Sequence, residues 1–429
     1  SNMLNFGGAL TGDGVIVAVM DSGLDTAVEC SSISNCAIMN SGMHQDFVGR
    51  LAGVVSYASG SCSVNCGPDD NQGHGTHTSG SVVGDGSNSG EGADNSGMAP
   101  GAYLFFQAVG SGTGDGTIVT PSYSSGFSDA YSAGARVSSN SWGSGPDSCS
   151  HDGNGDTGQD CWSTYSGGTW SLDSAAYDYP DLTILFSMGN DARDCYYTSY
   201  ATDGEGPGSG DGDPRICPGG KNGEINIGAM NQQANGKNII AVGASESARS
   251  NTGIPLYDRS YSSLYGSTYF GDPINGDMSS DTDLGDFSTE GMWALSNRGP
   301  AEDGRVKPDI VAPGSMILST RSELASPRAG EDMGDYYTVK SGTSMATPIT
   351  AGAVALLIEY LNNNYGYDCN LAIGPSSNNC PDAALIKGIL AASAHDMNGQ
   401  YSSGGDGQNG AVEKTPNEHE GWGRVDLQT

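Results

Sequence analysis

The chain has 429 residues, 36% of them hydrophobic, so it is long enough to bury a large core. It carries 50 acidic residues against 17 basic ones, and the formal net charge of −33 argues against nucleic acids and anionic membranes as partners. We find no run of about 18 consecutive apolar residues and therefore expect no membrane-spanning segment.

The first expected element is a buried strand. Residues 15–20 form a continuous apolar run, which is typical of a parallel strand covered on both faces. Asp21 follows at the carboxyl end of this strand, where open α/β sheets place their sites. Taken alone, without His74 and Ser344, Asp21 is better explained as a turn aspartate before Gly23.

A histidine motif comes next, with sequence GHGTHT at residues 73–78. We expect His74 to open a helix over residues 74–84, and the glycines on either side leave room for a ligand beside its ring. His77 is expected to support the structure rather than to react. Further strands are expected at residues 51–57, 102–109, 135–139, 182–186 and 239–244, and further helices at residues 127–134 and 381–395.

The chain is organised around a third motif, SGTSMATP at residues 341–348. Apolar residues then occupy nearly every face up to residue 361, so a helix running through the core is predicted. Pro348 is expected in its first turn, where a missing N–H is no loss. The free N–H groups of that turn favour negative charge beside Ser344, which suits a nucleophile. A buried helix capped by Ser or Thr is the simpler alternative.

A serine nucleophile needs a base and a group that orients the base, and His74 and Asp21 are of these types. The segments VAVMDSGLD, GHGTHTSG and SGTSMATP resemble the three signature motifs of the subtilisin-like serine protease (subtilase) family, in the same order. The likeness covers nearly the whole chain. In residues 295–314 it is strongest to secreted bacterial subtilases with alkaline optima, and residues 421–426 match the closing motif of the family.

The resemblance implies an α/β, three-layer subtilisin-like fold, with a mostly parallel central β-sheet, helices on both faces and long acidic loop insertions. It implies one catalytic domain over residues 1–429, from which a propeptide and a possible C-terminal β-domain are absent. Asp21, His74 and Ser344 would form the catalytic triad, and the Asn190 amide would donate to the oxyanion. In the family an aspartate near the position of Asp46 serves calcium binding or packing, and both roles stay open here.

Substrate residues follow from the same likeness. A peptide would add as a β-strand beside residues 141–143. The first specificity pocket would include residues 188–189, where the usual alanines before Gly-Asn are replaced by Ser187 and Met188. The expected substrate-binding residues are Ser141, Trp142, Gly143, Met188 and Gly189. For Trp142, packing in the core is the alternative.

Ten cysteines fall in five close pairs within loop-like segments rich in Gly, Ser and Asn. The pairs are Cys30 with Cys36, Cys62 with Cys66, Cys149 with Cys161, Cys195 with Cys217, and Cys369 with Cys380. Five local disulfides formed in an oxidising compartment are the simplest interpretation, which predicts a secreted, extracellular protein. Zinc binding is a weaker alternative, because no CxxC pair or Cys/His cluster occurs.

One cysteine pair encloses an acidic loop at residues 147–161, in which oxygen-bearing side chains alternate with glycines. This pattern resembles a calcium loop and predicts a structural Ca²⁺. The candidate ligands are Asp152, Asn154, Asp156 and Asp160. The match to an EF-hand is partial, since no glycine follows Asp156 directly, and a solvated acidic loop is equally consistent.

We therefore expect a secreted, monomeric serine endopeptidase that hydrolyses proteins or peptides through an acyl-enzyme, with a propeptide as a possible inhibitor. Two alternatives remain. One is a subtilase-like binding domain without activity. The other is a serine-carboxyl peptidase, a related fold that lacks a catalytic histidine, and the GHGTHT motif argues against it. The sequence does not define side-chain preference.

Overall fold

The computed structural model describes most of the chain, with gaps in the long insertions. The described residues are 10–25, 29–32, 35–37, 43–57, 68–90, 94–110, 118–146, 148–150, 160–192, 227–247, 291–293, 295–327, 331–369, 379–397 and 414–428.

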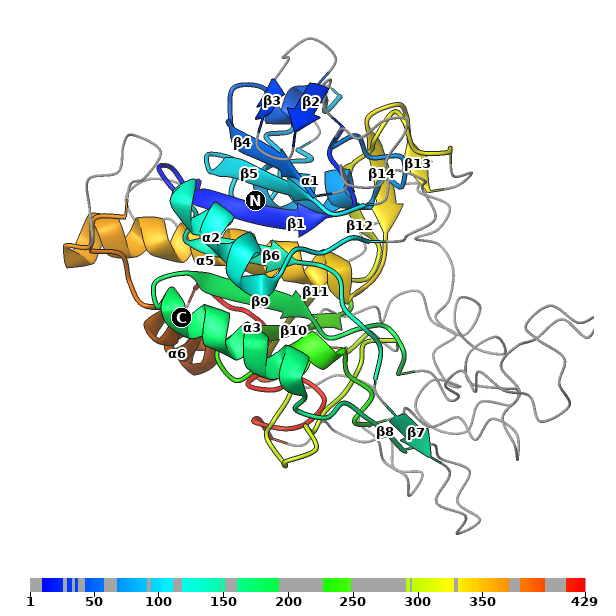
Figure 1. Ribbon diagram of the computed structural model, residues 1–429, viewed down its shortest axis with the longest axis vertical. Helices are drawn as coiled ribbons and strands as arrows, with labels where there is room; N and C mark the ends of the chain where they lie inside the picture. Colours follow the sequence, from blue (N-terminus) through cyan, green and yellow to red (C-terminus); the bar gives the residue numbers. More distant parts are fainter. Residues whose placement is uncertain are drawn as a thin grey trace, which may run out of the picture.

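A seven-stranded sheet forms the centre, in the order β11-β10-β9-β6-β1-β5-β4, and every neighbouring pair is parallel (Figure 1). The strands are β1 (Ile16–Asp21), β4 (Leu51–Ser56), β5 (Tyr103–Ala108), β6 (Val137–Asn140), β9 (Thr183–Ser187), β10 (Ile240–Ser245) and β11 (Ile310–Pro313). Val17 and Val19 of β1 belong to one core cluster, and Ile16 and Ala18 to another. The central strand is therefore buried on both faces, as its apolar run predicts.

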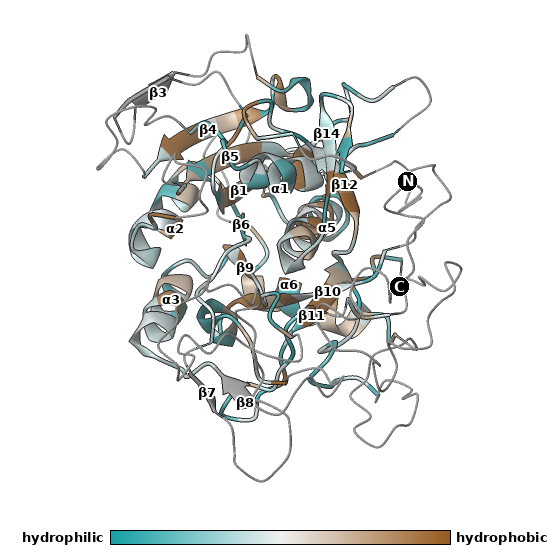
Figure 2. Cartoon of the chain, turned by 90° about the vertical axis from the view of Figure 1, so that its right-hand side faces the viewer, coloured by the Kyte–Doolittle hydropathy of each residue, from teal (hydrophilic) through white to brown (hydrophobic). Residues whose placement is uncertain are grey.

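Helices cover both faces of this sheet. In Figure 2, α1 and α5 lie on one side of the strands and α2 and α3 on the other, and side chains of α6 join the core cluster of α1 and α5. The helices are α1 (His74–Val83), α2 (Tyr123–Ser132), α3 (Gly167–Asp178), α5 (Thr343–Tyr365) and α6 (Ala383–Ser393), with short 3-10 turns η1 (Gln45–Phe47) and η3 (Gln232–Asn235). The predicted three-layer α/β fold is confirmed.

In the described part of the chain, three small antiparallel units accompany the main sheet. They pair β2 (Glu29–Ser32) with β3 (Asn35–Ala37), β7 (Ser148–Ser150) with β8 (Asp160–Trp162), and β14 (Tyr337–Lys340) with both β12 (Ile317–Thr320) and β13 (Asp332–Met333). The last unit matters for the site, because β14 leads directly into the SGTS motif and thus into α5.

The position of Pro348 differs from the prediction. Helix α5 begins at Thr343, so Pro348 is its sixth residue and lies inside the helix rather than in the first turn. A proline there removes the hydrogen bond to the carbonyl four residues earlier. That carbonyl belongs to Ser344, and it accepts a hydrogen bond from the Ser141 hydroxyl instead.

Helix α5 bears on the expectation that no segment of the chain spans a membrane. Among the described residues it is the one helix long and apolar enough to cross a membrane by length and composition. However, 78% of its most apolar window is buried inside the fold. Its composition is accounted for by its contacts with the central strands, as is usual for a core helix.

One of the five predicted disulfides is present in the described residues, between Cys369 and Cys380. In two further predicted pairs, the two cysteines occupy directly opposite positions of neighbouring antiparallel strands, and the disulfide bonds between them stay predictions. They are Cys30 with Cys36 and Cys149 with Cys161. The remaining two predicted pairs lie outside the described residues, so the structure does not test them. They are Cys62 with Cys66 and Cys195 with Cys217.

Candidate active site

The shortest side-chain contact of the candidate site joins Asp21 to His74. Asp21 ends β1 and is 3% exposed, while His74 opens α1 with its side chain 25% exposed. His74 Nδ1 lies 2.7 Å from Asp21 Oδ1. Asp21 also accepts from the Ser22 N–H at 2.7 Å and from Thr78 Oγ1 at 3.1 Å. Since a carboxylate only accepts, Nδ1 carries the proton and Nε2 is left as an acceptor.

A second buried carboxylate, Asp70, fixes the start of α1. Gly73 is the N-cap but has no side chain with which to cap the helix. Asp70 accepts instead from the N–H groups of Gly73 and Thr76 and from Ser22 Oγ, each at 2.8 Å. Burial raises the pKa of Asp70, and the hydrogen bonds from Thr76 and Ser22 oppose this shift. His74 is therefore carried on a helix end that is bonded to the end of β1.

The pKa of His74 is set by opposing influences. Burial lowers it, but the Asp21 carboxylate outweighs burial through its charge and its hydrogen bond, and the net pKa lies above the ordinary value of 6.5. Lys340, at the end of β14, lowers the His74 pKa, and Asp70 raises it. His74 is thus tuned to accept a proton readily.

Ser344, the second residue of α5, lies against Ser141. Ser344 Oγ donates to the Ser141 carbonyl at 3.1 Å, and Ser141 Oγ donates to the Ser344 carbonyl at 2.9 Å. The second bond supplies the donor that Pro348 lacks. Within the described part of the chain, no hydrogen bond joins Ser344 to His74. Ser344 lies in the first turn of α5 and His74 opens α1, and these two helices pack against each other.

Asn190 is anchored at the same helix end. Its Oδ1 accepts from both the N–H and the hydroxyl of Thr343, each at 2.9 Å. Because the backbone N–H can only donate, the amide orientation is determined and Nδ2 is the donor group left for a ligand. Asn190 Nδ2 lies beside Gly342, the residue before α5, since a Cβ atom added to Gly342 would be 3.5 Å from it. The Ser344 N–H belongs to the first turn of α5, which lacks intrahelical acceptors.

Two buried asparagines hold the loop that carries Asn190. Asn297, 0% exposed, donates from Nδ2 to the Met188 carbonyl (3.1 Å) and accepts from the Asp191 N–H (2.5 Å). Its own N–H donates to the Gly189 carbonyl at 3.0 Å. Asn231 adds bonds from its N–H to the Met188 carbonyl (2.8 Å) and from Nδ2 to the carbonyl of Ser187 (3.3 Å). Asn190 therefore sits between residues bonded to Asn297.

The expected substrate-binding residues lie around this loop. Gly189 has φ +104°, and a Cβ there would come within 2.3 Å of Asn297 Nδ2, so the backbone requires glycine. Gly143 is exposed and abuts Asn231. Trp142 is half-buried, with its ring centroid 5.2 Å from that of Phe186, so it packs on the core at the surface edge. Met188 is 0% exposed, so its side chain belongs to the core and does not form an open pocket wall.

Two further residues from the sequence analysis have structural surroundings. His77 is fully buried, and burial lowers its pKa to about 3, so it stays neutral and supports the fold as expected. Asp46 is also fully buried and accepts from the N–H groups of Gly86 and Asn88 and from Tyr337 Oη. These hydrogen bonds favour a packing role for Asp46, the second of the two roles considered for it, calcium binding being the first.

No group of three or more His, Cys, Asp or Glu side chains in the described ranges is placed to hold a metal ion. Of the four candidate calcium ligands, Asp152, Asn154 and Asp156 lie outside the described residues. Asp160 opens β8, opposite Ser150 of β7. The calcium site therefore stays a prediction.

Residues 12–423 match a sequence model described as Peptidase_S8, subtilase family. The match covers nearly the whole chain and includes all three motifs. The chain belongs to the subtilase family.

Curated relatives resemble this subtilase over different lengths. The serine protease/ABC transporter B family protein tagD of Dictyostelium discoideum is 28% identical over 467 residues, which cover 97% of this chain and 22% of the relative. The serine protease/ABC transporter B family protein tagB of the same organism is 27% identical over 433 residues, which cover 91% of this chain and 20% of tagB. The chain thus spans about a fifth of the length of these relatives. Serine protease AprX of Bacillus subtilis is 45% identical over 69 residues, 15% of this chain and 16% of AprX.

Solved structures resemble the subtilase in fold. Sphericase superposes with a TM-score of 0.52 at 19% identity, covering 100% of this chain and 95% of sphericase. A structure described as a lanthipeptide protease gives a TM-score of 0.53 at 17% identity, covering 97% and 88%. At such identities the likeness concerns the fold alone.

Several residues that shape this site in the subtilase were not found by sequence reasoning. Asp70, Thr78, Asn231 and Asn297 act through bonds to residues that are mostly distant in the chain. Only Asp70 and Thr78 offered a signal, since they flank or end the GHGTHT motif. Asn297 lies in residues 295–314, which resemble the family, but nothing in that segment marks it as a support for Asn190, and Asn231 lies in no such segment.

Proposed function

We propose that this subtilase is a serine endopeptidase that cleaves proteins or peptides through an Asp21–His74–Ser344 triad and an acyl-enzyme. The observation that carries the proposal is the 2.7 Å contact between His74 Nδ1 and buried Asp21. It leaves Nε2 free to accept a proton. Ser344 supplies a hydroxyl at the end of the helix that packs against α1.

In the proposed first step, the Ser344 hydroxyl turns about χ1 from the Ser141 carbonyl toward Nε2 of His74. Nε2 takes the proton while Oγ bonds to the substrate carbonyl carbon. Asp21 stabilises the imidazolium that forms. His74 then donates this proton to the leaving amine as the C–N bond breaks. Water then attacks the acyl carbon as His74 takes its proton, and His74 returns that proton to Ser344 Oγ as the ester C–O bond breaks and the acid leaves.

The developing oxyanion would be held by Asn190 Nδ2 and the Ser344 N–H. Asn190 suits this role because its Oδ1 is committed to Thr343, which directs the amide donors away from that residue. Asn297 and Asn231 restrict the loop and so limit how far the amide can drift. Such preorganised donors stabilise a transition state more than a substrate.

The test compares the wild type with Ser344→Ala on casein from about pH 5 to about pH 11. We expect activity at neutral to alkaline pH in the wild type and none in the variant, whose circular dichroism spectrum should be unchanged. Equal hydrolysis by both proteins would overturn the proposal. No activity in either would favour a subtilase-like binding domain.

We also propose that the protein is secreted and monomeric and that a propeptide inhibits it. The Cys369–Cys380 disulfide supports an oxidising compartment, since disulfides rarely persist in the cytosol. The net charge of −33 supports solubility without association. Measuring free thiols after denaturation without reductant tests the first point. Five disulfides would leave none of the ten cysteines free, and ten reactive thiols would contradict it.

Structural Ca²⁺ remains part of the proposal on sequence grounds. The β7–β8 hairpin supports it by bringing the two ends of the acidic loop together, with Ser150 opposite Asp160. If the loop binds calcium, EDTA should lower the melting temperature, and added calcium should restore it. Asp156→Asn should weaken this response. An identical melting temperature with and without EDTA would contradict the site.

A further inference from the structure

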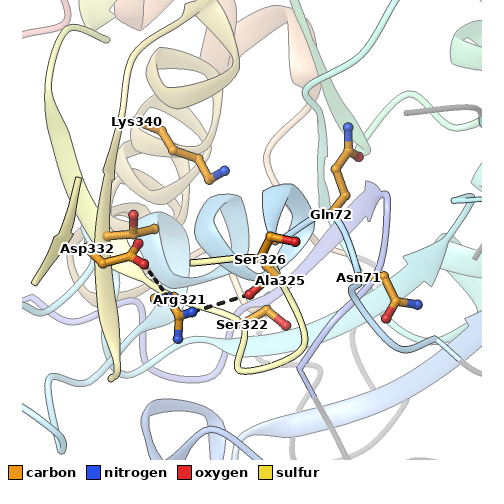
Figure 3. Close-up of a pocket in the computed structure, with 10 residues that line it drawn as sticks. Asn71, Gln72, Arg321, Ser322, Ala325, Ser326, Asp332 and Lys340 are labelled. Atoms are coloured by element: carbon orange, nitrogen blue, oxygen red, sulfur yellow. Dashed lines mark hydrogen bonds and ion pairs between the residues drawn. The ribbon is translucent and has the colours of Figure 1, made fainter. Parts of the chain in front are cut away.

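A polar cavity of about 350 Å³ lies beside the start of α1 and has no role in the chemistry described so far. Gly73, the residue before His74, lines it on one side, and Lys340, four residues before Ser344, lines it on the other. Figure 3 shows Lys340 reaching from the end of β14 toward the middle of the lining residues, with Gln72 on the far side. The cavity therefore adjoins the residue before His74, and one of its lining residues, Lys340, is close enough to lower the His74 pKa.

The described lining carries more positive than negative groups. It includes Arg321, Lys340 and a single carboxylate, Asp332. Arg321 is fixed in the wall, since its Nε lies 3.0 Å from Asp332 Oδ2 and its Nη2 donates to the Ala325 carbonyl at 3.3 Å (Figure 3). Because Arg321 is paired with Asp332, the net positive charge of the described lining comes from Lys340, in a chain that has 50 acidic and 17 basic residues. It would attract a carboxylate rather than an amine.

A second observation points to a ligand. Thr338, in the lining and 3% exposed, has a buried hydroxyl with no hydrogen-bond partner in the described part of the chain. A buried hydroxyl without a partner costs stability, and a rotation of the Thr338 side chain that turned the hydroxyl toward a bound acceptor would relieve this cost. Carboxylate oxygens accept from both ammonium and hydroxyl groups. Gln72, which is exposed, adds an amide donor at the rim.

The mechanism indicates which half of the substrate reaches this cavity. His74 gives its proton to the leaving amine, so the leaving-group half must pass the His74 side of the site. We propose that the cavity between Gln72 and Lys340 binds a substrate carboxylate within the first two residues after the cleaved bond. This inference rests on the proposed endopeptidase function. The carboxylate is an Asp or Glu side chain, or the chain terminus of a short leaving peptide.

The test uses a peptide library varied at the two positions after the cleaved bond, with amidated C-termini. The wild type should cleave peptides with Asp or Glu there about tenfold faster, in kcat/KM, than peptides with Asn or Gln, as a charge-assisted contact allows. Lys340→Met should abolish this preference and Lys340→Glu should reverse it toward Lys or Arg. Thr338→Val should weaken it by a smaller factor. Lys237→Met, with the same charge change on a lysine outside the cavity lining, should retain it.

A second arm separates the two carboxylate sources. Short neutral leaving peptides are compared as free acids and as amides. Preference for the free acid alone would assign the cavity to the chain terminus, and preference for acidic residues in amidated peptides would assign it to side chains. No preference for either in the wild type, or a preference unchanged in Lys340→Met, would overturn the inference while leaving the proposed function intact.

The cavity is also testable without turnover. Ser344→Ala should bind a fluorescent acidic peptide more tightly than its Gln counterpart, and Ser344→Ala/Lys340→Met should bind both equally. Equal binding by Ser344→Ala itself would refute the cavity assignment. Absence of Ser344-dependent hydrolysis in the library would instead refute the proposed function, and this binding measurement would still decide the cavity.

Discussion

The two halves of the candidate site are held by different chemistry. On the base side, His74 is oriented by the Asp21 carboxylate, and a second buried carboxylate, Asp70, fixes the helix that carries it. On the nucleophile side, the described hydrogen bonds of Asn190, Ser344 and their supports come from amides, hydroxyls and backbone groups. Buried carboxylates shape one half, and neutral dipoles shape the other.

This difference matches the charge that each half must stabilise. The imidazolium is positive, and a nearby carboxylate favours it. The oxyanion is negative, and amide donors with a helix N-terminus favour it. A carboxylate among the oxyanion supports would oppose the reaction. We therefore expect substitutions in the charged half and in the neutral half to have different effects on catalysis.

The largest effect is expected on the charged half. Asp21→Asn should lower kcat by about 10⁴-fold, because an amide at this position favours the wrong imidazole tautomer. Stopped-flow or long-time-course hydrolysis of a peptide substrate measures the loss. Thr78→Val, which removes only the secondary bond to Asp21, is the control and should lose far less. A loss below about tenfold in Asp21→Asn would contradict the orienting role.

The neutral half should show a smaller loss. Asn190→Ala should lower kcat by about 10² to 10³-fold with little change in KM, since the amide would act mainly in the transition state. Kinetics on one peptide substrate give both constants. If KM rose and kcat stayed constant, Asn190 would instead bind the ground state.

The supports of the neutral half can be separated from general stability. Asn297→Ala should lower kcat by about tenfold through misplacement of Asn190, and it should have no further effect in an Asn190→Ala background. The melting temperature should fall equally in both backgrounds. Asn235→Ala removes a comparably buried asparagine and should reduce stability without the kcat loss. Additive kcat losses would show that Asn297 does not act through Asn190.

The smallest effect concerns pH. His74 must be neutral to act as a base, and its pKa is raised, so kcat/KM should be lost as pH falls through a midpoint above 6.5. The charged groups that act on the ring are Asp21, Asp70 and Lys340. Lys340→Met should move the midpoint upward, because a cation that lowers the His74 pKa is removed. A midpoint below 6.5, or a downward shift in this variant, would contradict the account.

Sequence reasoning performed best where a residue's role depends on its own segment. Six of the seven strands of the central sheet were predicted within one or two residues, because a parallel strand covered on both faces must be apolar throughout. The seventh, β11, was not predicted as a strand, and helix α3 was not predicted at all. The start of α2 was missed by four residues. Residues 123–126 include two serines and a glycine, which are poor helix formers, and Ser122 caps the helix by accepting from the Ser125 N–H.

Long-range bonds account for two further misses, Pro348 and Asn297. Pro348 is tolerated inside α5 because Ser141, 203 residues away from Ser344, supplies a donor to the Ser344 carbonyl. Asn297 reaches Met188 and Asp191 across more than a hundred residues. Such partners depend on the tertiary fold, so one sequence offers no local pattern for them.

The most direct test of the account is the reaction with a serine-reactive fluorophosphonate, followed by mass spectrometry of the labelled peptide. The account predicts one adduct, on Ser344, formed above neutral pH and slowed by orders of magnitude in His74→Ala. Ser344→Ala should remain unlabelled. Labelling that is unchanged by His74→Ala, or an adduct on another serine, would contradict a nucleophile activated by the Asp21–His74 pair.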